Sequence, residues 1–267
     1  MEQKKYNYIE EYISKIRALG GFTFTYSGLK SAFDVSEAAI NLSLQRLKAR
    51  KAIAQVKKGF YVILPPEYAQ KGMIPASLFI DDLMKSLNKN YYVALLSAAA
   101  LHGASHQQPL EYFVVTKAPA VRRIKAANIV INFFVKKEWP QQTITKKKTD
   151  AGYIFVSSPE LTALDLLFYS NKISLSRALT VLQELHQSMK PSVLFRTAKE
   201  YKQTAAIQRL GYLLEKMPRT GKLSESLFRA LSGRNCFYIP LSPSKAKKGN
   251  TDTHWKIIIN TEIEGDL

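Results

Sequence analysis

The chain is poor in cysteine, since its 267 residues include only Cys236. A single cysteine excludes an intramolecular disulfide and a cysteine-based metal cage, and it fits a reducing compartment. Long apolar runs are missing as well, because the most apolar stretch, residues 91–101, is too short to span a bilayer. The charged opening segment also lacks the apolar core of a secretory signal. We therefore expect a soluble, cytoplasmic protein in which Cys236 is a small, half-buried apolar residue.

Sequence signatures of common enzyme classes are absent too. The chain contains no GxxxxGKS or GxxxxGKT phosphate loop, no GxGxxG turn after a strand, no GxSxG turn and no HExxH helix. His102 and His106 are four residues apart, but Gly103 should end the helix between them, so we do not expect a shared metal site. Glu111 and Lys117 flank an expected strand without the second carboxylate that a metal-dependent nuclease needs. We expect no catalytic residue, no metal and no cofactor.

Acidic residues are scarce relative to basic ones. The chain has 39 Lys and Arg against 21 Asp and Glu, which gives a formal net charge of +18. Such an excess attracts polyanions, with nucleic acid first and an anionic membrane surface second. The alternative is a basic protein with no polyanionic partner, so the location of the charge must decide. The length fits one small and one medium domain, and the composition, 46% hydrophobic and 22% charged, is that of a folded chain.

The first 64 residues show the pattern of three helices followed by a hairpin. The predicted elements are a helix, a short extended piece, two helices and two strands, at residues 4–19, 22–26, 28–33, 36–50, 53–56 and 60–64. Ser27 and Ser36 are the expected N-caps of the second and third helices. Gly59 suits a tight turn between the strands. This order is the winged helix-turn-helix plan, which we expect to occupy residues 1–72.

The remaining residues, 73–267, predict a larger mixed α+β domain. Apolar periodicity and capping residues predict helices over residues 76–87, 91–101, 159–168, 177–185, 192–201 and 205–216. Runs of β-branched and aromatic residues predict strands over residues 111–116, 129–135, 153–156 and 255–259. Because the main strands precede most of the helices, the pattern favours an α+β fold with a small sheet over a doubly wound one.

Positive charge is concentrated on the third predicted helix and the hairpin. No acidic residue lies between Glu37 and Glu67, and such a surface favours phosphate contact. A helical wheel with Ile40 and Leu44 inward turns amide, alanine and Leu42 side chains outward, where they could read base edges or, for Leu42, pack on another helix. The alternative is a merely solvated helix face. We predict double-stranded DNA contact by Ser36, Ala38, Asn41, Gln45, Arg46, Lys48, Arg50, Lys57 and Lys58.

A second basic set follows in the larger domain. Its members are Arg122, Arg123, Lys125, Lys136, Lys137, Lys146, Lys147 and Lys148, together with Lys117. They could form a secondary basic patch that extends the DNA footprint, contacts RNA or receives an acidic protein. Equally, they could protect edge strands and a loop from aggregation.

Five segments, taken in order behind the predicted winged helix, resemble the AbiEi antitoxins of AbiE-type (type IV) toxin–antitoxin systems. They are YYVALLSAAALHG (91–103), EYFVVTK (111–117), SSPELTALDLLFY (157–169), IQRLGYLLE (207–215) and HWKIIINTEIEGDL (254–267). The resemblance implies a phage abortive-infection protein that represses its own operon by binding promoter repeats and neutralises a cognate AbiEii-like nucleotidyltransferase toxin. It also implies that DNA meets the third helix and wing.

The shared segments have mainly structural roles when their residues are considered singly. Gly211 should permit close approach of a neighbouring element, and Arg209 could meet a carboxylate. Asp165, set among leucines, should pair with an arginine. Two other functions stay open at this point: an antitoxin that acts mainly through protein or RNA contacts with the winged helix secondary, and, more remotely, a nuclease.

Overall fold

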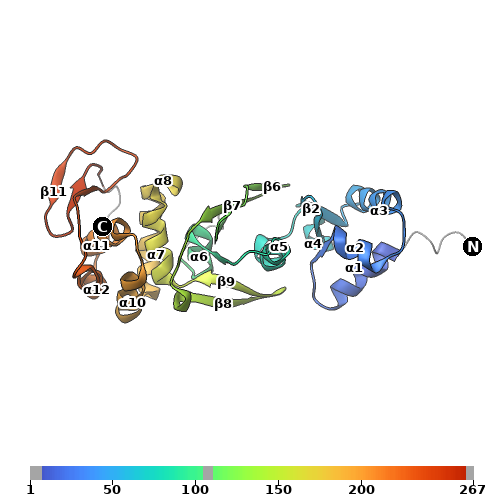
Figure 1. Cartoon of the computed structure of the whole chain (residues 1–267), viewed down its shortest axis with the longest axis horizontal. Coiled ribbons are helices and arrows are strands. Elements are labelled where there is room, and N and C mark those ends of the chain that lie inside the picture. The colour runs from blue at the N-terminus through green and yellow to red at the C-terminus, as the bar shows by residue number, and fades with distance from the viewer. Residues whose placement is uncertain (1–7, 105–110, 263–267) are drawn as a thin grey trace, which may run out of the picture. The chain divides into compact units, whose positions relative to one another are not determined.

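The structure is a computed structural model that describes residues 8–104 and 111–262 (Figure 1). It divides into two compact units. The first comprises Met1–Tyr91, Leu110–Val135 and Lys146–Phe155, and the second comprises Tyr92–Pro109, Lys136–Thr145 and Val156–Leu267. The division does not fall at the predicted boundary of residues 72 and 73, because segments distant in the sequence complete the first unit. The α+β class is confirmed.

The N-terminal part of the first unit contains three helices and a three-stranded antiparallel sheet. The elements are α1 (Tyr8–Ala18), β1 (Thr23–Thr25), α2 (Tyr26–Ala32), α3 (Glu37–Ala49), β2 (Ile53–Lys57) and β3 (Phe60–Ile63), with strand order β1-β3-β2. The three predicted helices and the hairpin are confirmed, and residues 4–7 of the first predicted helix lie outside the described residues. The predicted cap of α2 is wrong, because Thr25 rather than Ser27 accepts the Gly28 N–H, at 3.0 Å.

These elements share one apolar core. Ile40, Leu44 and Leu47 of α3 are all buried, as their spacing of four and three residues requires for one helix face. They pack in a cluster that includes Phe24 and Tyr61, whose rings stack with centroids 5.3 Å apart. The core therefore fixes which side of α3 faces solvent.

The segment that follows contains short helices. They are α4 (Pro66–Ala69), η2 (Ala76–Leu78) and α5 (Ile80–Ser86). The single helix predicted over residues 76–87 is thus divided, because Phe79 adopts φ −137° and ends the first turn. The Thr23 hydroxyl donates to Asp82 at 2.6 Å, which ties β1 to α5.

A six-stranded mixed sheet has the strand order β6-β7-β5-β4-β9-β8. Its strands are β4 (Tyr91–Val93), β5 (Glu111–Thr116), β6 (Ile124–Ala126), β7 (Ile129–Val135), β8 (Ile144–Thr149) and β9 (Gly152–Ser157). The strands predicted at 111–116, 129–135 and 153–156 are confirmed, whereas β6 and β8 were not predicted. The helix predicted over 91–101 is wrong at its start, because Val93 pairs with Val156 in β4–β9 and only α6 (Leu95–Leu101) is helical.

The helices of the second unit gather around α7. They are α7 (Pro159–Phe168), α8 (Ser170–Ile173), α9 (Leu175–Leu185), η4 (His186–Ser188), α10 (Pro191–Glu200), α11 (Thr204–Lys216) and α12 (Gly221–Leu231). The central helix α7 contacts α6, α9, α10 and α11 and begins as predicted, with Ser158 accepting the Leu161 N–H at 3.3 Å. No helix in residues 8–104 and 111–262 is long and apolar enough to cross a membrane.

A second three-stranded sheet lies near the end of the chain. It has the order β10-β12-β11 and consists of β10 (Ile239–Pro240), β11 (Asn250–Asp252) and β12 (Ile257–Ile259). The predicted close approach at Gly211 is confirmed, because a Cβ there would lie 2.0 Å from the Trp255 ring. The strand predicted from Trp255 begins only at Ile257, since the Trp255 N–H donates to Asp252 in a turn, at 2.7 Å.

Candidate nucleic-acid interface

The solvent-facing side of α3 carries the amide and alanine side chains predicted to read DNA. Ala38, Asn41, Gln45, Arg46 and Lys48 are all exposed. Leu42 lies among them and is 46% exposed. Its packing against another helix, one of its two predicted roles, is therefore not seen in the described chain.

At the N-terminal end of α3, one side chain caps the helix and a lysine pairs with the acidic residue. The Ser36 hydroxyl accepts the Ala39 N–H at 3.3 Å, so this side chain caps the helix. Glu37, the one acidic residue of α3, accepts a hydrogen bond from Lys30 of α2 at 2.6 Å. That contact lowers the pKa of Glu37 and raises the pKa of Lys30. The one carboxylate of α3 is thus paired with a cation.

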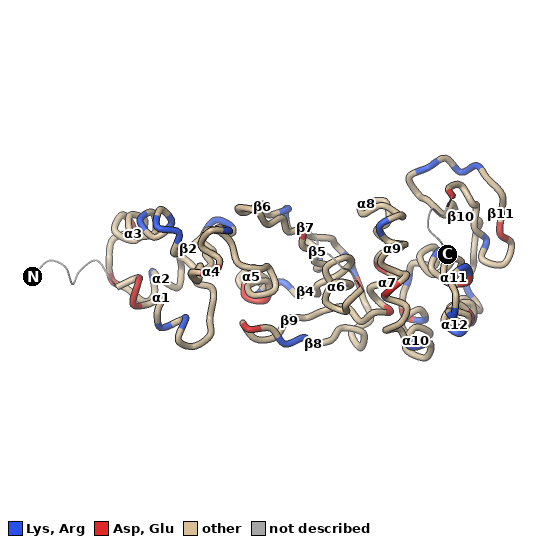
Figure 2. Tube along the Cα trace, turned by 180° about the vertical axis from the view of Figure 1, so that it is seen from behind, with Lys and Arg blue, Asp and Glu red and all other residues tan. Residues whose placement is uncertain are grey.

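The C-terminal end of α3 and the hairpin turn carry the cations. Lys48 and Lys58 are exposed and Lys57 is partly exposed, while Gly59 adopts φ +78° in the turn. Figure 2 shows Lys and Arg in blue along α3. Arg50, in contrast, pairs with Glu10 of α1 at 3.1 Å. No local pattern predicts that pair, because the two residues are forty positions apart. Arg50 is therefore less available to phosphate than the lysines.

The second basic set does not form one patch. Arg122, Arg123 and Lys125 lie on or just before β6, whereas residues 146–148 lie on β8. The strand order places β6 and β8 at opposite edges of the sheet. The predicted members of a secondary basic patch are therefore divided between two edges, because β6 pairs with β7 and β8 lies beside β9. Two further members are exposed: Lys117, directly after β5 in the first unit, and Lys137 in the second unit.

Lys136 was predicted in that patch but is buried, with 4% of its surface exposed. Its ammonium lies 2.5 Å from Oδ1 of Asp165, which is fully buried. The hydroxyls of Tyr92 and Tyr201 donate to the same carboxylate at 2.7 and 2.8 Å. Burial lowers the pKa of Lys136. Asp165 thus pairs with a lysine rather than the predicted arginine, and Lys136 belongs to the core.

Arg209 also departs from its prediction. Its Nε donates to the Pro240 carbonyl oxygen at 3.0 Å and thereby links α11 to β10. No carboxylate pairs with it among the described residues. Burial lowers the pKa of this guanidinium. The neighbouring Gln208 donates to the carbonyls of Phe237 and Trp255, at 3.0 and 2.8 Å. Both polar residues therefore hold the C-terminal sheet onto the helices.

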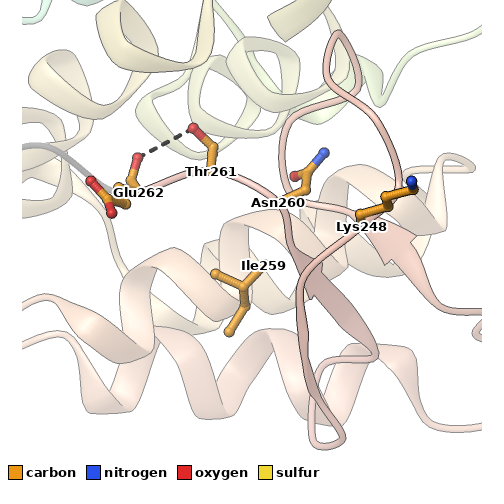
Figure 3. Close-up of a pocket in the computed structure, with 5 residues that line it drawn as sticks. All are labelled: Lys248, Ile259, Asn260, Thr261 and Glu262. Atoms are coloured by element: carbon orange, nitrogen blue, oxygen red, sulfur yellow. Dashed lines mark hydrogen bonds between the residues drawn. The ribbon is translucent and has the colours of Figure 1, made fainter.

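A hollow of about 730 Å³ lies beside β12 and is lined by Lys248, Ile259, Asn260, Thr261 and Glu262 (Figure 3). The Asn260 side chain accepts the Ser242 N–H and donates to the Ser242 carbonyl, both at 2.9 Å. These bonds fasten the lysine-containing loop that precedes β11. In residues 8–104 and 111–262, no three His, Cys, Asp or Glu side chains could hold a metal ion together. His106 lies outside the described residues.

Comparison with known proteins finds a family match in the middle of the chain. Residues 92–216 match the family model of the AbiEi antitoxin C-terminal domain. The chain carries an AbiEi antitoxin domain. The resemblance predicted from the sequence segments is therefore confirmed over these residues, and the match supports an antitoxin role. The AbiEi match begins in β4 and ends with α11, and it includes the buried Asp165–Lys136 pair.

One solved structure supports the fold over a longer stretch than the AbiEi match. The crystal structure of the RV2827C protein from Mycobacterium tuberculosis is similar with a TM-score of 0.65 and 14% identity, over 93% of this chain and 89% of that one. An antigenic nucleotidyltransferase-like protein from Paracoccidioides brasiliensis has a TM-score of only 0.36 and 15% identity, over 57% of this chain and 90% of that one, and supports no argument. No curated protein matches the chain.

Proposed function

We propose that this AbiEi-domain protein is a DNA-binding repressor of its own operon as well as an antitoxin. The order helix, strand, helix, helix, hairpin, with strand order β1-β3-β2, agrees with a winged helix-turn-helix in which α3 is the recognition helix and the turn at Lys57–Gly59 is the wing. The observation that carries the proposal is the exposed face of α3, which presents Asn41 and Gln45 beside Lys48.

The proposed chemistry of this face separates base contacts from phosphate contacts. Asn41 and Gln45 are one helical turn apart, about 6 Å along α3, so both can reach base edges in one major groove. Carboxamides pair with N6 and N7 of adenine, and Ala38 and Leu42 suit thymine methyl groups. The ammonium group of Lys48 suits phosphates, which fix the position of the protein without reading sequence. Ser36 acts as the helix cap rather than as a base contact.

The wing supplies further cations to the DNA backbone. Lys57 and Lys58 directly precede Gly59, and the positive φ of this glycine allows the tight turn between β2 and β3. Each lysine that meets a phosphate releases condensed counterions. About six such contacts would give a slope of log K against log salt near −5.

The AbiEi domain, in the same proposal, neutralises a toxin of the nucleotidyltransferase class and performs no catalysis itself. Promoter binding through α3 would then connect the amount of free antitoxin to transcription of the operon. The match of residues 92–216 to an antitoxin domain supports this half of the proposal.

The test is a salt-dependent gel shift on the promoter upstream of the gene. Asn41→Ala with Gln45→Ala should reduce the preference for that promoter over random DNA, and each lost bidentate contact should cost about 1–3 kcal/mol. Lys57→Ala with Lys58→Ala should instead weaken binding to both DNAs and reduce the salt slope by about 2. Equal affinity of the unmodified protein for promoter and random DNA would refute specific repression.

The same variants distinguish the proposal from an antitoxin that acts mainly through protein or RNA. In cells that express the toxin, the variants should release repression of the promoter. If the toxin is still neutralised at equal antitoxin levels, the two functions are separable and DNA binding controls only expression. If loss of DNA binding changes neither promoter activity nor growth, the winged helix is secondary and autorepression is refuted.

A further inference from the structure

Two edge strands of the first unit lie against each other. β2 is the last strand in the order β1-β3-β2, and β6 is the first strand of the six-stranded sheet. The two strands are in contact (Figure 1). A second contact lies nearby, since a Cβ on Gly72 would be 3.9 Å from the Cβ of Ala127, just after β6. The strand that leads into the wing is therefore bordered by β6.

β6 turns its charged residue outward. Ile124 and Ala126 are buried, with 9% and 7% of their surfaces exposed, whereas Lys125 between them is exposed. This alternation is that of a strand with one face on the core and one in solvent. Arg122, just before β6, is also exposed. Antiparallel pairing with β7 fixes Lys125 opposite Val130, so the backbone that carries it is held in place.

Of the three cations near β6, one is already engaged. Arg123 forms an ion pair with Glu111, whose other carboxylate oxygen accepts from Asn132 at 2.8 Å. In the described part of the chain, no ion pair engages Arg122 or Lys125. Cations that have no carboxylate partner, on a strand held in place by its neighbour, are suited to bind phosphate groups.

We propose that Arg122 and Lys125 extend the DNA-binding surface beyond the wing and contact the phosphate backbone of the duplex that α3 reads. This inference rests on the proposed function and adds a second structural element to it. The strand order selects these two residues from the basic set, because Lys146 and Lys148 occupy β8 at the opposite edge of the sheet. The partner is duplex DNA and the contact is independent of base sequence.

The experiment compares two double variants with the same loss of charge in the full-length protein. One is Arg122→Ala with Lys125→Ala, and the matched control is Lys146→Ala with Lys148→Ala on β8. Affinity for the promoter is measured between roughly 50 and 200 mM salt. The β6 variant should show a slope of log K against log salt shallower by about 2, with an unchanged ratio of promoter to random DNA binding. The β8 control should keep the slope of the unmodified protein.

Charge-conserving exchange provides a further check on the same surface. Arg122→Lys with Lys125→Arg should retain the unmodified slope, because phosphate contact needs the charge more than the side-chain shape. The four substituted residues are all exposed, so we expect each variant to fold. Circular dichroism of each variant checks this.

The outcomes separate the inference from the proposed function. If Lys57→Ala with Lys58→Ala reduces the slope but the β6 variant does not, the inference fails and the proposed function stands. If the β6 variant and the β8 control reduce the slope equally, the effect is one of net charge and the inference is overturned. A β6 variant that binds DNA normally but no longer neutralises the toxin would assign this edge to a protein partner instead. If the unmodified protein does not bind DNA, both fail.

Discussion

Replacement of Lys136 by methionine tests the buried ion pair of the AbiEi domain. Methionine keeps much of the side-chain length and apolar contact but removes the ammonium that lies 2.5 Å from Asp165. Asp165 is then a fully buried carboxylate supported only by the hydroxyls of Tyr92 and Tyr201. Removal of one partner from a buried pair costs about 3–5 kcal/mol, because the other charge remains in a medium of low polarity.

A double-mutant cycle shows whether the cost comes from the pair. Asp165→Asn keeps an oxygen that accepts from one tyrosine hydroxyl and gains an N–H that can donate to the oxygen of the other. Combining it with Lys136→Met therefore removes both charges and leaves few unsatisfied groups. The double variant should therefore lose less stability than the sum of the two single variants, with a coupling energy of at least about 1 kcal/mol.

Urea denaturation followed by tryptophan fluorescence provides the measurement. The Trp139 ring lies 5.2 Å from the Tyr92 ring, so its emission reports on this region of the core. Lys136→Met should lower the denaturation midpoint and leave the salt slope of DNA binding unchanged, because Lys136 is buried. The reasoning is refuted if Lys136→Met is within about 0.5 kcal/mol of the unmodified protein, or if the single effects simply add in the double variant.

Three further predictions follow from the geometry. Burial beside Asp165 raises the pKa of Tyr92 and Tyr201 well above 10. The stability that these neutral hydroxyls contribute is therefore complete below the unfolded pKa of about 10 and is lost as the pH rises above it. An alkaline titration of tyrosinate absorbance should show these two tyrosines ionising only with unfolding, and their ionisation in the folded protein would contradict this. Gly211→Ala should destabilise the fold by about 1–3 kcal/mol in urea denaturation, because the new Cβ meets the Trp255 ring, and an unchanged midpoint would show that the ring moves freely. Thr25→Ala should cost about 1 kcal/mol through loss of the α2 cap, whereas Thr25→Ser should restore most of it; equal stability of the two variants would disprove the cap.

Local patterns predicted the N-terminal elements well. The four- and three-residue spacing of Ile40, Leu44 and Leu47 defines the buried side of α3 without any knowledge of its neighbours. Gly59 marks the hairpin turn for a similar reason, because glycine can adopt a positive φ wherever it stands in a chain. The outward position of Asn41 and Gln45 follows directly, so the reading face of the candidate site was accessible from the sequence.

Elements chosen by distant partners were not predicted. The helical reading of residues 91–101 ignored β4, because the pairing of Val93 with Val156 joins segments more than sixty residues apart. The pairing of Arg50 with Glu10 likewise joins residues forty positions apart. A window of neighbouring residues contains no information about such contacts.

The sequence alone determined the α+β class, the helices and hairpin of the N-terminal segment, the excess of positive charge and the resemblance to AbiEi antitoxins. Only the tertiary structure decided which cations are available to a polyanion. Lys125 and Lys136 look alike in the chain, yet one is exposed on an edge strand and the other is buried against Asp165. Periodicity is a local property of the backbone, whereas burial and sheet order depend on partners that meet only when the chain folds.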